Sequence, residues 1–143
     1  MPLRPNLSME VFARRGEGRL PGLMGFRPVS IVEGRVDAEL DIRAELLAPN
    51  GYLHAATVIA LADTACGYGC IAHLPPGAEN FTTIELKTNF LGTAREGKLT
   101  CVATASHLGS TTQVWDAVVT DPGKGRTIAL FRCTQLVLWP RAK

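Results

Sequence analysis

The spacing of apolar residues changes along the chain, and each spacing predicts a type of element. Within residues 34–43, charged side chains at odd positions alternate with apolar ones at even positions. A period of two is typical of a strand with one face in solvent. Together with residues 23–32, this stretch predicts a hairpin that turns at Glu33 and Gly34.

The second half of the chain predicts four more strands joined by short connections. They are expected over residues 81–91, 98–107, 112–120 and 126–138. Because the connections are short, we expect the four strands to form an antiparallel meander.

A long helix is expected between these two groups of strands, from about residue 54 to residue 73, where Leu74-Pro-Pro-Gly ends it. It is apolar almost all round, so we expect protein to enclose it on nearly all sides. Residues 52–72 also have the length of a membrane span. Asp63 lies at their centre, however, where a carboxylate costs roughly 2.5–3.5 kcal/mol in lipid. We therefore expect a core helix and no membrane partner.

These elements predict an α+β fold, in which one long helix packs on a curved antiparallel sheet. We expect a single domain over residues 1–143, in which residues 1–22 form an N-terminal helix (6–15) and a loop (16–22). A net charge of +2 gives no electrostatic reason to bind nucleic acid. Charged residues are only 20% of the chain, which favours a surface partly covered by another subunit.

The four cysteines are expected to be buried free thiols in a reducing compartment. No apolar leader follows Met1, so no signal peptide is visible and we expect a cytoplasmic protein.

Asp63 is the polar residue that the apolar helix does not explain. Its helical neighbours three and four positions away are Ile59, Ala60, Cys66 and Gly67, and none can pair with a carboxylate. Three outcomes are open. The carboxyl can bond to another segment in a structural role, face solvent, or line a functional cavity.

His54 lies at the predicted start of the same helix, where backbone N–H groups are unpaired and can stabilise a developing oxyanion. It is nine residues from Asp63, about 13 Å along the helix and on its opposite side. One chain therefore cannot easily bring both to one substrate. A symmetric dimer with antiparallel helices can place His54 of one subunit beside Asp63 of the other.

Residues 49–56 (PNGYLHAA) and 60–65 (ALADTA) carry a resemblance to a known family. They resemble the hotdog-fold acyl-CoA thioesterases of the phenylacetate-pathway (PaaI-like) family, whose pattern is Gly, two residues, His-Gly-Gly, then a Leu-Ala-Asp-Thr-Ala-like segment. Residues 82–91, 107–112 and 131–134 also fit, and the similarity covers about residues 24–138.

The resemblance implies a hotdog fold and hydrolysis of an acyl- or aryl-CoA to a free acid and coenzyme A, with no metal or redox cofactor. It also implies a homodimer or homotetramer with active sites at the dimer interface. By the same likeness, Asp63 is the general base or nucleophile, the Ala55 N–H binds the thioester oxygen, His54 polarises that carbonyl and Thr83 positions water. The residues expected to bind substrate are Asn50, Gly51, Arg95, Lys98 and Ser110.

The sequence departs from the family pattern in three ways. The His-Gly-Gly motif is His54-Ala55-Ala56, Ala48 replaces an Asn, and Ser110 replaces an Arg. These departures keep a second reading open, a non-catalytic hotdog protein that binds or senses acyl-CoA. A hotdog hydratase or dehydratase and a purely structural Asp63 are further alternatives.

Overall fold

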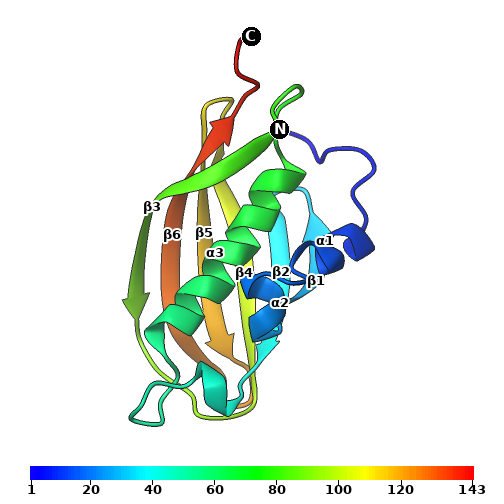
Figure 1. Ribbon diagram of the computed structural model, residues 1–143. Helices are drawn as coiled ribbons and strands as arrows, with labels where there is room; N and C mark the ends of the chain where they lie inside the picture. Colours follow the sequence, from blue (N-terminus) through cyan, green and yellow to red (C-terminus); the bar gives the residue numbers. More distant parts are fainter.

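Alternating side chains on the second strand join the sheet to the long helix. In the computed structural model, which describes residues 1–143, strand β2 (Arg35–Asp41) buries Val36, Ala38 and Leu40 and turns its charged residues outward. The buried side chains face helix α3 (Ala55–Ala72), around which the sheet curves (Figure 1). The expected arrangement of a curved antiparallel sheet and one long helix is thus confirmed.

The sheet has six antiparallel strands in the order β1-β2-β4-β5-β6-β3. Their remaining bounds are β1 Arg27–Val32, β3 Asn80–Phe90, β4 Lys98–Leu108, β5 Thr112–Asp121 and β6 Arg126–Leu138.

The predicted four-strand meander is wrong for its first member. β4, β5 and β6 follow one another, but β3 pairs with β6 at the far edge of the sheet. Both edges of β4 are already taken, by β2 on one side and β5 on the other, so β3 has no place beside it. One edge of β3 therefore remains unpaired in this chain.

The N-terminal segment also differs from the prediction. Helix α1 (Met9–Arg15) lies within the expected helix, but the expected loop gives way to a second helix, α2 (Leu20–Met24). Pro21 in its first turn favours a helix, and Gly25 ends it with a φ of 83°. The first strand consequently begins at Arg27 and not at residue 23.

Small residues in the C-terminal half of α3 let the sheet approach closely. A Cβ on Gly69 would lie 2.6 Å from the Trp115 ring, and one on Gly67 would lie 2.7 Å from Phe81. The helix is long and apolar enough to cross a membrane, but most of it is buried inside this chain.

A buried polar network fixes the end of α3 at His73. The ring Nδ1–H bonds to the Gly69 carbonyl (2.7 Å), and Nε2 accepts the Gly34 N–H (2.9 Å). The Gln113 side chain donates to the His73 carbonyl (2.9 Å) and accepts from the Trp115 indole N–H (3.0 Å). Gln113 is therefore a satisfied structural residue.

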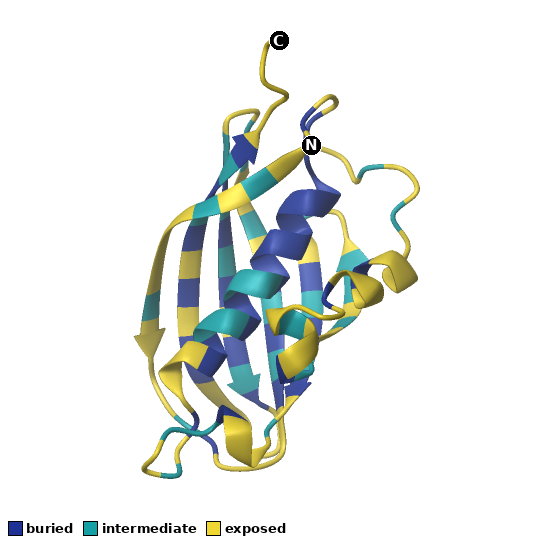
Figure 2. Cartoon of the chain, in the orientation of Figure 1, coloured by how far each residue is buried: buried dark blue, intermediate teal, exposed yellow.

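The N-terminal half of α3 is not enclosed as predicted. Figure 2 shows exposed and partly buried residues alternating with buried ones in this half, whereas residues 65–72 are all buried. Four of the uncovered positions are spaced three or four residues apart and form one stripe along the helix: Ala56, Ile59, Ala60 and Asp63. The sheet of one chain is too narrow to cover this stripe.

Candidate active site

His54 caps the N-terminus of α3. The preceding turn is shaped by Gly51, with a φ of 83°, and by Asn50, whose side chain accepts the Tyr52 N–H (3.1 Å). His54 Nδ1 then accepts the Ala56 N–H at 2.9 Å. Because Nδ1 is the acceptor, the neutral ring carries its proton on Nε2.

Two hydrogen-bond donors thus lie at the exposed start of the helix. One is the His54 Nε2–H, and the other is the Ala55 N–H, which as the first helical amide has no acceptor within the helix. The partial positive charge of a helix N-terminus adds to both. This end of α3 is suited to hold an oxygen that gains negative charge.

Asp63 lies two turns further along, half-buried on the stripe. The Thr83 hydroxyl of β3 donates to its Oδ1 at 2.9 Å. Burial raises the pKa of Asp63, and hydrogen bonding with Thr83 and Gln135 opposes that rise. Of the three outcomes that the sequence left open, the structure therefore combines two, because the carboxyl bonds to another segment and also lines an open face.

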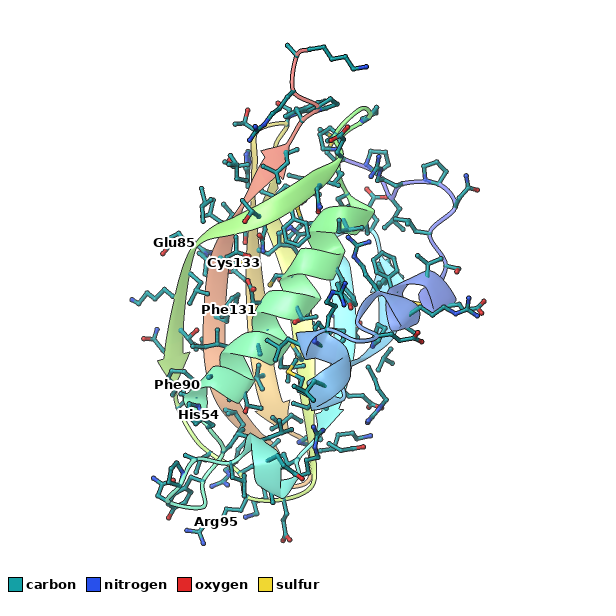
Figure 3. All side chains as sticks on the ribbon, in the orientation of Figure 1. His54, Glu85, Phe90, Arg95, Phe131 and Cys133 are labelled. Carbon is teal, nitrogen blue, oxygen red and sulfur yellow. The ribbon has the colours of Figure 1, made fainter.

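The uncovered surface beside Asp63 is apolar. Leu86 and Phe90 on β3 pair with Cys133 and Ala129, which are buried on the side of the sheet that α3 covers. Yet Leu86 is 39% exposed and Phe90 45% exposed, since nothing in this chain covers the sheet edge. Figure 3 shows Phe90 at the same end of the molecule as His54. We call the α3 stripe together with Leu86 and Phe90 the open face.

One chain brings together only part of the predicted catalytic set. Asp63 and Thr83 are in contact. His54 and Ala55 lie together at the helix start, about 13 Å away along the helix axis. The structure thus agrees with the sequence argument that His54 and Asp63 of one subunit are separate.

The predicted substrate-binding residues fall in different places. The Arg95 guanidinium stacks over the Tyr52 ring, 4.1 Å from its centroid. The Leu53 N–H bonds to the Ala94 carbonyl (3.0 Å), which holds Arg95 next to the turn before His54. A cavity of about 280 Å³ opens here, lined by Tyr52, Thr93, Arg95, Lys124 and Arg126 among others.

Lys98 and Ser110 are not part of this group. Lys98 pairs with Glu39 (3.1 Å) on the outer face of the sheet, away from α3. Ser110 lies in the turn between β4 and β5, where its carbonyl accepts from Trp139 (3.0 Å), beyond the C-terminal end of α3. Within one chain it is at the opposite end from His54.

No group of three His, Cys, Asp or Glu side chains is placed to hold a metal ion. The four cysteines are free and buried, and both ring nitrogens of His73 are taken by protein hydrogen bonds.

Comparison with known proteins assigns this arrangement to a family. Residues 50–128, which include the helix start, Asp63 and Thr83, match the family model described as Thioesterase superfamily. The chain belongs to this superfamily. The superfamily and its solved members confirm both the hotdog fold and a thioester hydrolase.

The similarity to individual thioesterases extends over most of the chain. A 1,4-dihydroxy-2-naphthoyl-CoA hydrolase of Listeria monocytogenes is 31% identical over 111 residues, 78% of this chain and 89% of that protein. One from Escherichia coli is 29% identical over 135 residues, 92% and 96% of the two chains. A mutant of thioesterase PA1618 from Pseudomonas aeruginosa superposes with a TM-score of 0.89 at 25% identity, covering 96% and 99%.

Gln135 is a site residue that was not predicted from the sequence; it is fully buried and lies 2.8 Å from the Thr83 hydroxyl. A signal was present in β6, where alternate residues Phe131, Cys133 and Val137 are buried. An amide at the remaining position of that apolar series is unusual and needs a partner.

We predict that Thr83→Val raises the pKa of the Asp63 carboxyl further, because it removes the hydroxyl that donates to the charged form. Titration of the carboxyl by carbon-13 NMR measures the shift. Thr88→Val is the matched control, since Thr88 lies on the same strand and its buried hydroxyl has no partner. An unchanged Asp63 pKa in Thr83→Val would contradict the assignment.

Proposed function

We propose that this thioesterase hydrolyses an acyl- or aryl-CoA to the free acid and coenzyme A. The observation that carries the proposal is a half-buried carboxylate, Asp63, that is hydrogen-bonded by Thr83 and set in an apolar face. A carboxylate in such surroundings has a raised pKa and is a better base than one in water. The CoA hydrolases among the relatives support this class of substrate.

In the proposed reaction, the thioester oxygen binds the Ala55 N–H and the His54 Nε2–H. Asp63 takes a proton from water, whose oxygen attacks the thioester carbon, or attacks that carbon itself as a nucleophile. The negative charge then develops on the oxygen at the helix start, where the two donors stabilise it. The C–S bond breaks, its electron pair goes to sulfur, and the thiolate of coenzyme A leaves as the thiol, taking up the proton that Asp63 removed from water. On the nucleophilic route, water then hydrolyses the acyl–Asp63 anhydride to the free acid and supplies the proton that the thiolate takes up. This reaction needs no metal or redox cofactor.

The site also requires a second subunit, in a homodimer or a pair of dimers forming a homotetramer. An eleven-residue edge strand with an apolar inner face is a ready template for pairing. Pairing of β3 with its copy would make one continuous sheet and cover Leu86 and Phe90. The covered surface would be apolar, as is typical of the centre of homodimer interfaces.

Antiparallel pairing of β3 has a consequence for the chemistry. Thr83, which is hydrogen-bonded to Asp63, lies near the start of β3. Phe90 lies at the other end of β3, beside the start of α3. A two-fold axis near Leu86 and Lys87 sets Thr83 of one subunit opposite Phe90 of the other. Asp63 of each subunit then approaches His54 of its partner, and each dimer holds two sites. The same two-fold rotation brings the turn that contains Ser110 toward the start of α3 in the partner subunit.

The open face suits an apolar acyl group. Ile59, Leu86 and Phe90 would line its walls, and an aromatic ring can stack on Phe90. Two relatives are hydrolases of an aromatic CoA thioester, 1,4-dihydroxy-2-naphthoyl-CoA. A panel of aryl- and alkyl-CoA substrates tests this preference, and the proposal expects the aryl thioesters to have the higher kcat/KM.

The cavity beside Arg95 is the proposed place for the phosphates of coenzyme A. It lies next to the turn that leads to His54, and Arg95, Lys124 and Arg126 give it three cationic side chains against Glu96 and Asp121. Tyr52 offers an aromatic face beside them. The proposed compartment is the cytoplasm, where acyl-CoA and reduced thiols occur, and four free buried cysteines agree with it.

We predict that Asp63→Asn abolishes thiol release from acyl-CoA, measured with DTNB, while the oligomer stays intact. The same variant is expected to be more stable than the wild type at neutral pH. Because the folded-state pKa of Asp63 is raised, ionisation costs stability as the pH rises through that value. The gain should shrink toward the unfolded pKa of about 3.9, where both states are protonated.

Turnover within a few-fold of the wild type in Asp63→Asn would refute the role of Asp63. Tight binding of an acyl-CoA by the wild type without thiol release would refute the hydrolysis of that substrate.

We further predict that Arg95→Met raises KM for acyl-CoA severalfold and changes kcat little, because the phosphates contribute binding remote from the reacting carbon. Lys98→Met is the matched control, since Lys98 pairs with Glu39 on the outer face and should leave KM unchanged. Substrates cut back to acyl-pantetheine, which lack the nucleotide, should show no difference between the two variants. Equal KM values for acyl-CoA in Arg95→Met and Lys98→Met would show that Arg95 does not bind the substrate.

A further inference from the structure

A chain of three polar side chains runs from Asp63 into the core. Thr83 Oγ1 lies 2.9 Å from Asp63 Oδ1 and 2.8 Å from the side-chain oxygen of Gln135. The Gln135 amide nitrogen lies 3.3 Å from the sulfur of Cys133. Gln135 is 0% exposed, so its amide depends on protein groups for its hydrogen bonds.

With the Gln135 amide in this orientation, these side chains have too few hydrogen atoms for all of their contacts if Asp63 is ionised. The Thr83 hydroxyl has one proton, and it faces two oxygens, one on Asp63 and one on Gln135. A carboxylate is the stronger acceptor and takes that proton. The Gln135 oxygen would then face the Thr83 oxygen with no hydrogen between them. A half-turn of the terminal amide removes this conflict, because it exchanges the positions of oxygen and nitrogen.

We propose that Gln135 is a positioning residue that holds the Thr83 hydroxyl with its proton directed at Asp63. In the turned amide, Gln135 donates N–H to Thr83 Oγ1, and Cys133 donates its S–H to the amide oxygen. Every donor then points toward Asp63, and each bond in such a chain strengthens the next. The inference rests on the proposed function, in which Asp63 must be ionised to act.

The groups around Asp63 favour this arrangement. The titratable neighbours are the thiols of Cys66 on α3 and Cys133 on β6. Burial raises the pKa of Cys66, so this thiol stays neutral. No charged side chain of the chain contributes to the pKa of Asp63, which is raised by burial and lowered only by its hydrogen bonds. The hydrogen-bond donors are therefore what favours the ionised form of the carboxyl.

The chain offers a matched control for this role. Gln113 lies directly opposite Gln135 on β5 and is also 0% exposed. Its amide is used by His73 and Trp115, with no connection to Asp63. Gln→Met at either position removes a buried amide of similar size, so both variants lose structural hydrogen bonds. Only the change at Gln135 should alter Asp63.

The first test is the pKa of the Asp63 carboxyl, measured by carbon-13 NMR in the wild type, Gln135→Met and Gln113→Met. We expect it to rise in Gln135→Met and to stay unchanged in Gln113→Met. A second variant, Cys133→Ala, keeps the glutamine but removes the donor to its oxygen, and should give a smaller rise in the same direction. An unchanged pKa in Gln135→Met and Cys133→Ala overturns the proposal.

The second test is catalytic. In Gln135→Met, the acidic limb of the kcat/KM profile should move to higher pH and kcat should fall about three- to tenfold, with KM little changed. In a Thr83→Val background, Gln135→Met should have a clearly smaller effect than it has alone, because Gln135 acts mainly through Thr83. Fully additive effects in this double variant would contradict the proposal that Gln135 acts through Thr83. If the variants show the expected pKa changes but the wild type does not hydrolyse acyl-CoA, the proposed function is refuted and the positioning role of Gln135 stands.

Discussion

The hydrogen bond from Thr83 to Asp63 is the contact on which the candidate site depends. It joins the helix to the edge strand and supplies a donor to a carboxylate that the helix itself leaves without a partner. Burial raises the pKa of Asp63, and without such a donor the carboxyl would be protonated over a wider pH range. The proposed catalytic group is thus held at a cost in stability, as functional sites commonly are.

The position of this bond follows from the topology. β3 cannot lie beside β4, because β2 and β5 occupy both of its edges, so it forms the outer edge next to β6. That position leaves the apolar side chains of β3 and the N-terminal half of α3 uncovered. The same uncovered surface serves the two proposed roles, as an interface for a second subunit and as walls for an acyl group. The separation of His54 from Asp63 along one helix is then a reason to propose a dimer.

Much of this could be predicted from the sequence, because local patterns determine it. Strict alternation over residues 34–43 gave the strand β2, and the apolar run with an isolated Asp63 gave the core helix. The likeness of residues 49–65 to a known family pointed to the superfamily that the comparisons confirm. The separation of His54 and Asp63 followed from helix geometry alone.

The rest depends on contacts between distant residues. Nothing local in β3 shows that it pairs with β6, since the edges of β4 are filled by strands far away in sequence. Gln135 was missed because its partner Thr83 is 52 positions away. Lys98 was grouped with Arg95 on charge and nearness in sequence, although the alternation of Leu99 and Cys101 already places Lys98 on the outer face of its strand. Helix α2 escaped because its five residues are too few for a periodic pattern.

The central claim is that each site takes His54 from one subunit and Asp63 from the other. Dimers formed at random from equal amounts of His54→Ala and Asp63→Asn chains test it most directly. If the site is shared, half of the dimers are mixed and each mixed dimer contains one intact site, so the mixture regains about a quarter of wild-type thioesterase activity. If the mixture is as inactive as its two parents, the site is not shared between subunits.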